Sequence, residues 1–316
     1  MSLQIRSITF RQLEVFLTFT SCLSINKTAE NLNLSQPTIS IQLKKLSDVI
    51  GFSLYEVIGK KIQLTAEGEL LKKYSIYVFN AVKNLEYDLS ALHDLKSGVL
   101  TIGMVETATY FIPVLLGEFT KTYSGIEICI KVGNREQILH SAHQGELDFF
   151  ILSNLPNELD FCAYEFQKNP LVMVAAKSHP LVNAPEVALS SLLKEDFILR
   201  EVGSETREIA EQFFNQQGMN VQIKLTIASN EGIKEAVKAG LGVSILSEHC
   251  LTYGGHDGLS ILKVKGFPLV SHWHLCYLAK KQLSHAGQTF LAFMRNSSND
   301  LMSIPLPLTT KLPSSI

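Results

Sequence analysis

The sequence predicts a helical N-terminal head with a small β wing, one long helix, and a larger α/β body of two lobes. Three observations support this fold class. Apolar residues follow a helical spacing through the first ninety or so residues. From Val99 onward, strand patterns and helix patterns alternate. The length of 316 residues suits about two domains.

The composition narrows the class of protein. Hydrophobic residues make up 46% and charged residues 18%, which is enough for substantial cores and unlike a disordered chain. No stretch approaches the roughly 18 uninterrupted apolar residues of a membrane span. The apolar run 15–23 has no small-residue cleavage site after it. We therefore expect a soluble, unprocessed, cytoplasmic protein with no membrane partner.

The side chains that could bind metal are not arranged as a metal site. The five cysteines are scattered without a C-x-x-C pair, which favours reduced thiols: Cys22, Cys129, Cys162, Cys250 and Cys276. The pairs His140/His143 and His272/His274 are more simply explained as polar positions on a helix and a strand. We expect no metal and no cofactor.

The net charge of −2 is unevenly distributed. Residues 1–96 carry 11 Lys and Arg against 9 Asp and Glu, whereas the remainder carries 17 against 21. A weakly basic head on an acidic body is a hint that the head meets an acidic partner.

The head begins with two short helices. Apolar residues in Phe10–Phe19 form a helical stripe. A second helix is expected over Thr28–Leu32 after Ser24, with Ala29 facing inward, and Asn33 then makes a tight turn. Ser35 is a suitable N-cap for a third helix, and Pro37 is tolerated in its first turn. Ile39, Leu43 and Leu46 bury one face of this helix, and Gly51 ends it.

A helix, a short turn and a second helix form the pattern of a helix-turn-helix, whose second helix enters the DNA major groove. Gln36 can bind adenine, and the hydroxyls and lysines can contact bases or phosphates. Residues 54–57 and 62–64 resemble two strands of a wing. The candidate DNA-binding residues are Thr28, Ser35, Gln36, Pro37, Thr38, Ser40, Lys44, Lys45, Lys60 and Lys61. The alternative is a small helical domain with solvated lysines.

A long helix follows, with Thr65 as its N-cap and Gly68 an unfavourable residue near its start. Its apolar residues recur at near-heptad steps from Leu71 to Leu92. An exposed apolar seam of this kind predicts a homodimer. The alternative is a helix that packs on the following domain.

The body is expected to contain βα units. Strands are predicted at 100–105, 126–132, 147–152, 171–176, 197–199, 221–227 and 271–278. Helices are predicted at 111–122, 134–144, 206–217, 230–239 and 288–294. This order predicts a mainly parallel sheet in two lobes, with a ligand between them at the carboxyl ends of the strands. Residues 296–316 read as a loose tail rich in Ser, Pro and Thr.

These landmarks resemble the LysR-type transcriptional regulators over nearly the whole chain. The resemblance lies in Phe10–Leu13, Ser35–Ser40 and Leu64–Gly68, in family order and spacing. It implies a winged helix-turn-helix at 1–66, a linker helix at 67–97, and a periplasmic-binding-protein-like effector domain at 98–296. Its lobe 1 would comprise 98–168 and 271–296, its lobe 2 would comprise 169–270, and 297–316 would be a tail. Ile41 and Val57 depart from the family pattern, which often has arginine there.

Three segments of the body indicate which branch of this family the chain resembles: 133–137, 197–207 and 229–234. They resemble regulators of Calvin-cycle (Rubisco) operons and of sulfur, nitrogen and carbon assimilation. The resemblance implies a DNA-bending activator that recognises an interrupted inverted repeat in double-stranded DNA. It also implies a homodimer through the linker helix, a homotetramer, and contact with RNA polymerase.

A small anionic metabolite is the expected effector, because hydroxyls, helix starts and guanidinium groups can hold an oxyanion. Glu106 would repel it unless that carboxylate is turned away or hydrogen-bonded. Arg207 is the strongest single candidate, although each residue could equally cap a helix or join the lobes. The candidate effector-binding residues are Glu106, Thr107, Ala108, Thr109, Asn134, Arg135, Ser153, Arg200, Gly203, Ser204, Thr206, Arg207, Ser229 and Asn230.

Two other classes of protein are less consistent with the sequence. A solute-binding protein would share the two-lobed body but would need export and would leave the helical head unexplained. An enzyme would need a catalytic site, and none is predicted. Gly240–Ile245 lacks the third glycine of a dinucleotide loop and the closing glycine of a nucleophile elbow.

Overall fold

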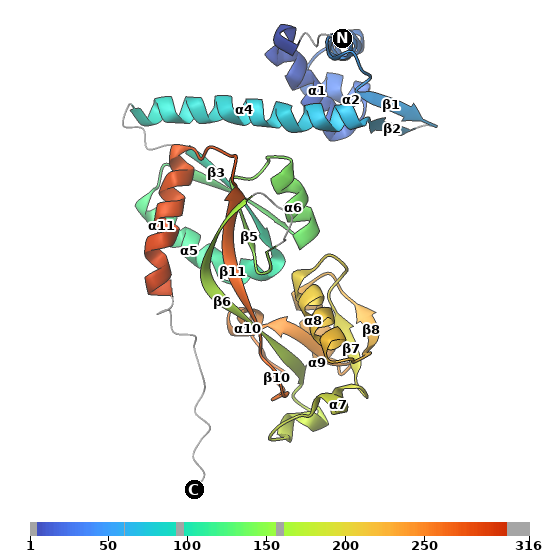
Figure 1. Ribbon diagram of the computed structural model, residues 1–316, viewed down its shortest axis with the longest axis vertical. Coiled ribbons are helices and arrows are strands. Elements are labelled where there is room, and N and C mark those ends of the chain that lie inside the picture. Colours follow the sequence, from blue (N-terminus) through green and yellow to red (C-terminus); the bar gives the residue numbers. More distant parts are fainter. Residues whose placement is uncertain (1–4, 60, 93–97, 156–160, 302–316) are drawn as a thin grey trace. The chain divides into compact units, whose positions relative to one another are not determined.

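The computed structural model describes residues 5–59, 61–92, 98–155 and 161–301 (Figure 1). Residues up to 86, together with 143–146, form one compact unit, and the other described residues form a second. Within the described ranges, no helix is both long enough and apolar enough to cross a bilayer.

The head is built from three helices, a two-stranded wing and the start of a long helix. Its elements are η1 (Ile5–Ser7), α1 (Phe10–Cys22), α2 (Ile25–Leu32), α3 (Gln36–Ile50), β1 (Tyr55–Ile58), β2 (Lys61–Leu64) and α4 (Ala66–Leu92). The buried core comprises Val15, Phe16, Phe19, Ala29, Ile39, Leu43, Leu46 and Leu54. The predicted inward faces of the second and third helices are therefore confirmed.

The starts of the head helices are set by hydroxyl side chains. Thr9 forms a capping box with Gln12 at the start of α1. Ser24 accepts the Lys27 N–H, so α2 begins at Ile25, three residues earlier than predicted. Ser35 accepts the Thr38 N–H at 3.3 Å, which confirms the predicted N-cap of α3.

The ends of the same helices use left-handed backbone. Asn33 has φ 53° at the end of α2, which makes the predicted tight turn, and Leu23 has φ 46° at the end of α1. Gly51 has φ 81° at the end of α3, as expected for a residue without a Cβ. These turns let three helices pack on one another within about forty residues.

The wing is a two-stranded antiparallel sheet with Tyr55 opposite Leu64. Thr65 accepts the Gly68 N–H at 3.0 Å and so caps α4, as predicted. Close packing explains why position 68 is a glycine, because a Cβ there would lie 2.0 Å from the Leu54 carbonyl oxygen. The residue that looked unfavourable for the helix is required by its close packing on the wing.

Helix α4 spans 27 residues, about 40 Å at the usual rise. Of its predicted seam, Leu71 packs against the head core, whereas large side chains farther along remain solvent-exposed in this single chain: Tyr74, Val78, Leu85 and Leu89. The predicted helix extended to residue 97, but 93–97 lie outside the described residues. An apolar stripe without a covering element is the feature that a helix-to-helix dimer would bury.

The body combines strands and helices in two lobes. The lobe 1 elements are β3 (Gly98–Val105), η2 (Glu106–Tyr110), α5 (Ile112–Thr122), β4 (Ile126–Gly133), α6 (Arg135–His143), β5 (Phe149–Leu152) and α11 (His285–Leu301). The lobe 2 elements are η3 (Pro180–Asn183), α7 (Leu189–Leu192), β7 (Asp196–Leu199), α8 (Glu205–Gln216), β8 (Gln222–Thr226), α9 (Asn230–Lys238), β9 (Ser244–Ser247), α10 (Glu248–Thr252) and β10 (Leu259–Ile261). Strands β6 (Phe161–Ala176) and β11 (Leu269–Leu278) belong to both.

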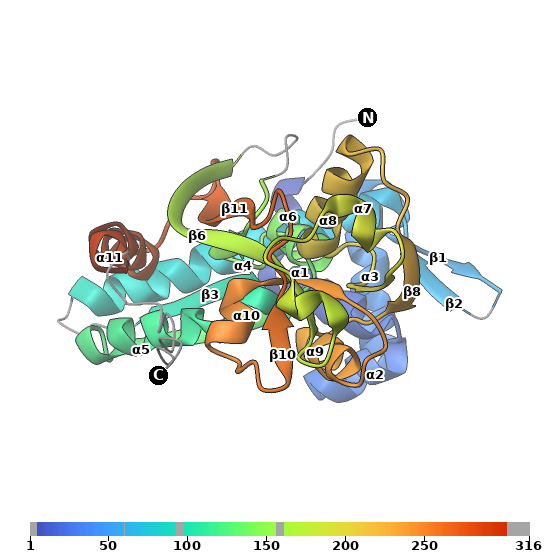
Figure 2. The same ribbon diagram turned by 90° about the horizontal axis from the view of Figure 1, so that it is seen from below.

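The two crossing strands correct the prediction. The strand expected at 171–176 begins ten residues earlier, at Phe161, and pairs with β11 from Leu171↔Leu269 to Phe161↔Leu278. Figure 1 and Figure 2 show this pair running through both lobes. The polar half of β6 carried no buried-strand pattern, because most of its side chains are only partly covered.

The sheet order also differs from the expectation. The main sheet runs β10-β6-β11-β5-β3-β4, and β9 also pairs with β6. Only the ladders of β3 with β4 and β5 are parallel in this sheet, and β7 and β8 form a separate parallel pair. The expectation of a mainly parallel sheet is therefore wrong for the described residues. The crossing strands return antiparallel, which no local pattern reveals.

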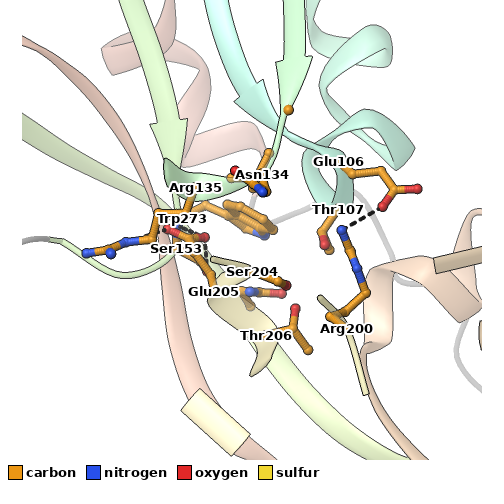
Figure 3. A pocket seen from close by; sticks show the side chains of 13 residues that line it. Glu106, Thr107, Asn134, Arg135, Ser153, Arg200, Ser204, Glu205, Thr206 and Trp273 are labelled. Atoms are coloured by element: carbon orange, nitrogen blue, oxygen red, sulfur yellow. Dashed lines mark hydrogen bonds and ion pairs between the residues drawn. The ribbon is translucent and has the colours of Figure 1, made fainter. Parts of the chain in front are cut away.

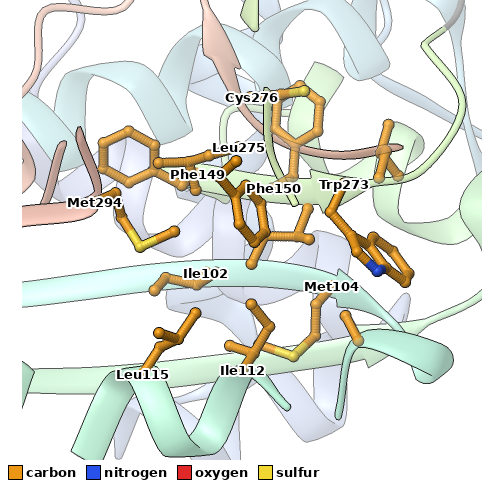
Figure 4. Packing of buried hydrophobic residues seen from close by; sticks show 14 of the residues in the cluster. Ile102, Met104, Ile112, Leu115, Phe149, Phe150, Trp273, Leu275, Cys276 and Met294 are labelled. Carbon is orange, nitrogen blue, oxygen red and sulfur yellow. The ribbon is translucent and has the colours of Figure 1, made fainter. Parts of the chain in front are cut away.

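Each lobe has its own hydrophobic core. In lobe 1, helix α5 packs Ile112 and Leu115 on β3, with Phe149 and Met294 nearby in the same cluster (Figure 4). The helix predicted from Phe111 starts at Ile112, because a 3-10 turn precedes it. The last helix, α11, continues to Leu301 although a tail was predicted from 297. The first helix-breaking proline after it is Pro305, so nothing earlier forbids the helix.

Candidate functional site

A narrow polar pocket lies between the lobes of the body (Figure 3). It is lined by Val105, Glu106, Thr107, Gly133, Asn134, Arg135, Ser153, Asn169, Arg200, Ser204, Glu205, Thr206 and Trp273. Its free volume of about 10 Å³ is room for about one water molecule, so a larger ligand requires the lobes or the lining side chains to move apart.

The fold explains why these residues converge. Strands β3, β4 and β5 run in the same direction, so their carboxyl ends meet at one edge and bring residues 106–107, 134–135 and 153 together. In lobe 2, β7 ends at Leu199 and α8 starts at Glu205, which places Arg200 and 204–206 opposite. This position outside the strand ends is the usual ligand position in α/β folds.

Arg200 is a buried cation held by two carboxylates. Its guanidinium lies 2.9 Å from Glu106 Oε2 and donates to both carboxylate oxygens of Glu201 at 2.8 and 3.1 Å. It also donates to Asn230 Oδ1 at 2.8 Å. Only 4% of the Arg200 side chain is exposed, and removal of its guanidinium would leave two partly buried carboxylates without their cation.

Asn230 extends this cluster across the cleft. Its backbone N–H donates to Glu106 Oε1, and its side-chain amide donates to Thr107 Oγ1, both at 3.3 Å. Glu106 is therefore hydrogen-bonded and paired with Arg200, which meets the condition under which an anion is tolerated beside it. We call Glu106, Thr107, Arg200, Glu201 and Asn230 the arginine cluster.

Glu205 forms a second connection between the lobes. Its carboxylate accepts the Ser153 N–H at 2.8 Å, the Ser153 hydroxyl at 2.6 Å and the Asn154 N–H at 3.2 Å. Arg135 lies 3.7 Å away and also pairs with Glu208 at 3.3 Å. Burial raises the pKa of Glu205 to about 7, although these hydrogen bonds and Arg135 oppose the shift.

Two further lining residues come from the crossing strands. Asn169 on β6 is buried, and its Oδ1 accepts the Ser247 hydroxyl at 2.7 Å. Trp273 on β11 is fully buried, and its indole nitrogen has no hydrogen-bond partner among the described residues. The sequence pattern predicted neither residue, because only the tertiary pairing of β6 and β11 brings them to the pocket. Glu205, the first residue of α8, was also not predicted.

Most of the predicted effector residues meet here. Those that line the pocket are Glu106, Thr107, Asn134, Arg135, Ser153, Arg200, Ser204 and Thr206. Asn230 lies behind this lining as part of the arginine cluster. Their role as ligand contacts stays a prediction, but the structure does bring them together.

The remaining candidates have local roles in the structure. Arg207, the strongest sequence candidate, does not line the pocket: it donates to Glu211 at 2.7 Å and to the Arg200 carbonyl at 3.0 Å. Ala108 is buried in η2, and the Thr109 hydroxyl donates to the Glu106 carbonyl. Ser229 caps α9, and Gly203 makes a turn with φ 87°. Arg200, and not Arg207, is therefore the cation that lobe 2 contributes to the pocket lining.

The candidate DNA-binding residues of the head are mostly accessible. Ser35, Gln36, Pro37, Lys44, Lys45 and Lys61 are exposed, and Thr38 and Ser40 are half-buried. Ser35 and Thr38 share a hydroxyl contact of 2.8 Å. Lys60 lies outside the described residues. The start of α3 therefore presents amide and hydroxyl groups to the solvent, as a reading helix must.

Thr28 requires a correction. Its side chain is fully buried, and its hydroxyl donates to the Ser24 carbonyl at 2.7 Å. A direct side-chain contact with DNA is therefore inconsistent with the structure. The hydroxyl instead ties the first turn of α2 together, which a sequence pattern of polar residues could not distinguish from a DNA contact.

Comparisons with known families match both parts of the chain. A profile described as "Bacterial regulatory helix-turn-helix protein, lysR family" matches residues 10–69. A profile described as "LysR substrate binding domain" matches residues 93–299.

Curated relatives align along almost the whole chain. It is 41% identical to the HTH-type transcriptional activator CmpR of Synechocystis, over 92% of this chain and 95% of that protein. It is 37% identical to the regulator CfxR of Cupriavidus necator, over 93% of each chain. Identity to a RuBisCO operon transcriptional regulator of Acidithiobacillus ferrooxidans is 36%, over 94% and 97%.

Solved structures agree with the fold. The regulatory domain of Synechocystis CcmR in complex with 2-PG is 40% identical, with a TM-score of 0.62 over 65% of this chain and 99% of that one. Full-length CbnR, solved with its target DNA, has a TM-score of 0.68 over 92% of this chain and 100% of that one. At 18% identity, CbnR supports the fold alone.

Proposed function

This chain belongs to the LysR family of helix-turn-helix transcriptional regulators, and from that premise we propose that it controls carbon-fixation or related assimilation genes in response to a small anionic effector. It is a DNA-binding regulator and not an enzyme. The choice of pathway is supported by relatives named as RuBisCO operon regulators and CmpR. The cytoplasm, where the DNA is found, is the proposed location.

The exposed start of α3 carries the DNA-binding part of the proposal. Gln36 is exposed and carries an amide that can bind an adenine edge, and Thr38 and Ser40 follow on the same helix. Lys44, Lys45 and Lys61 are exposed cations that can neutralise phosphates. Two heads joined through the α4 seam would read an interrupted inverted repeat, and pairing of effector domains would give a tetramer that bends the DNA.

The inter-lobe pocket carries the effector part. It combines buried hydroxyls, two guanidinium groups and a helix start within one small volume. The related CcmR domain was solved with 2-PG, so 2-PG and other small anions are the ligands to test first. No further cofactor is proposed.

Ligand binding can act only through different affinities for two arrangements of the lobes. The arginine cluster and Glu205 both connect the lobes, so an anion that changes either connection changes cleft closure. Altered closure would change how effector domains pair, and thereby the spacing of the heads on DNA. RNA polymerase contact would depend on that spacing.

The experiment is binding of the purified full chain to the DNA upstream of its own gene, against a scrambled duplex, across a salt series. We expect clear preference for the native duplex, with log K falling linearly with log salt concentration. Equal weak binding to both duplexes at every salt concentration would contradict the proposal of a nearby operator.

A further inference from the structure

Trp273 joins the hydrophobic core of lobe 1 to the wall of the pocket. Its side chain is fully buried in this core (Figure 4). Its ring centroid lies 5.4 Å from that of Phe111. The same indole lines the pocket, between Asn134 and Ser204 in the view of Figure 3. The residue therefore has an apolar environment on one side and a polar cavity on the other.

The indole N–H has no acceptor. It is one of the few buried side-chain polar atoms without a hydrogen-bond partner among the described residues. A buried tryptophan N–H normally finds a partner, because an unpaired donor loses its hydration without compensation. The pairing of β11 with β6 shifts register between Trp273 and His274, and such bulges re-aim side chains next to functional sites.

The start of α8 offers unfilled donors on the same pocket. The first N–H groups of a helix lack intrahelical acceptors, and the Ser204 side chain does not cap this helix. Ser204, Glu205 and Thr206 are all buried, so bulk water has little access to these groups. Two independent sets of donors thus face one cavity.

The two carboxylates in the pocket wall are engaged elsewhere. Glu106 accepts the Asn230 N–H at Oε1, and its Oε2, which accepts no hydrogen bond, is ion-paired with Arg200. Glu205 accepts three hydrogen bonds from Ser153 and Asn154. No described residue accepts the indole N–H, so an oxygen atom of a bound molecule can serve as its acceptor.

We propose that Trp273 recognises the effector directly, by donating its indole N–H to an anionic oxygen that also meets the start of α8. This inference rests on the proposed function, since it assigns a reading residue to the same effector pocket. The expected ligand is therefore a compact molecule with a carboxylate or phosphate group. A ligand end that carries only donors would leave the indole N–H unpaired.

The chain contains a single tryptophan, which allows a sharp test. Expression in a tryptophan auxotroph supplied with 3-benzothienylalanine replaces the N–H of Trp273 by sulfur and changes no other position. Calorimetry on the full-length protein, with inorganic phosphate, acetate and 2-PG as probes, then compares affinities. We expect anion affinity to fall roughly ten- to hundredfold, as for loss of a hydrogen bond to a charged group.

Two variants separate recognition from packing. Trp273→Phe also removes the donor, so it should weaken binding at least as much as the sulfur analogue. Phe111→Leu disturbs the packing of the indole but keeps its N–H, and we expect anion affinity within about threefold of the wild type. The sulfur analogue should lose no thermal stability without ligand, because its N–H has no partner to lose.

The outcomes are distinct. Phosphate binding without acetate binding would assign a phosphate group to the site, and the reverse would assign a carboxylate. Equal anion affinity in the wild type and the sulfur analogue overturns the role of Trp273 and leaves the effector proposal intact. Failure of every probe to bind the wild type overturns both the anionic effector and this inference. The DNA-binding assay tests the regulatory function independently of these probes.

Discussion

The head and the inter-lobe pocket use polar side chains in opposite ways. In the head, Gln36, Lys44 and Lys45 are exposed on a helix whose buried face alone holds it in place. In the pocket, Arg200, Glu205 and Asn230 are buried and hydrogen-bonded to one another or to the opposite lobe. The difference indicates that the head can contact DNA without rearrangement, whereas a ligand in the pocket has to compete with existing contacts.

The largest effect is expected when the arginine cluster is broken. Arg200→Met should lower the free energy of unfolding of the body by about 3 to 5 kcal/mol, because it leaves Glu106 and Glu201 without their cation. Urea unfolding of the full chain measures this. Arg207→Met is the matched control, since Arg207 has only a partly exposed pair with Glu211 and one carbonyl contact. Equal losses in the two variants would contradict a special role for Arg200.

The second effect is a pH dependence of stability caused by Glu205. In the unfolded chain this carboxyl ionises near its ordinary pKa of 4.5, but in the folded chain its pKa is about 7. Between these values the unfolded state has lost a proton that the folded state keeps. Stability therefore falls as pH rises through this window, by about 3 kcal/mol in total. The charged or titratable groups facing Glu205 are Arg135, with Glu208 behind it, and the Cys276 thiol.

Glu205→Gln isolates that contribution. The variant has no carboxyl to ionise, so its stability relative to the wild type should increase from pH 5 to pH 8. Urea titrations at four pH values measure the difference, and other titrating groups cancel between the two proteins. Parallel stability profiles would show that Glu205 ionises normally in the folded state.

A third effect should appear in DNA binding without a change in stability. Replacing Lys44 and Lys45 together by alanine should weaken binding roughly 30-fold at physiological salt and reduce the salt slope by about 2. The free energy of unfolding should stay within about 0.5 kcal/mol, because both side chains are exposed. Gel-shift titrations at several salt concentrations test this, and an unchanged slope would remove these lysines from the interface.

The smallest effect distinguishes two threonines of the head. Thr38→Val at the exposed start of α3 should weaken DNA binding severalfold, through loss of a hydroxyl that can reach bases or phosphates. Thr28→Val should leave DNA affinity within about twofold, and should lower stability by about 1 kcal/mol, because its buried hydroxyl bonds only within the head. A larger loss of DNA affinity in Thr28→Val would indicate that Thr28 contacts DNA despite its burial.

The head could be predicted closely because its signals are local. Ser35, Gly51 and Thr65 each determine a helix end through a contact no more than four residues away, and the buried stripe of α3 follows helical spacing. Gly68 is an exception to this local control, because the need for glycine there comes from its close approach to Leu54, fourteen residues earlier.

The pocket was predicted only in part because two of its lining residues depend on long-range pairing. Thr107, Asn134, Ser153 and Ser204 follow strand ends, so the sequence order places them correctly. Trp273 and Asn169 reach the pocket through the antiparallel crossing strands, which have no signature beyond their apolar ends. The sequence indicates Arg207 and gives no sign of Glu205, because composition does not show which side of a helix start faces the other lobe.

The central claim is that effector binding in the pocket changes the spacing of the heads more than their affinity for a half-site. Footprinting on the operator, with and without a ligand that calorimetry has verified, tests it most directly. We expect a change in the extent of protection or in the DNA bend, with half-site affinity nearly constant. Identical footprints in both states, or a change in half-site affinity alone, would contradict it.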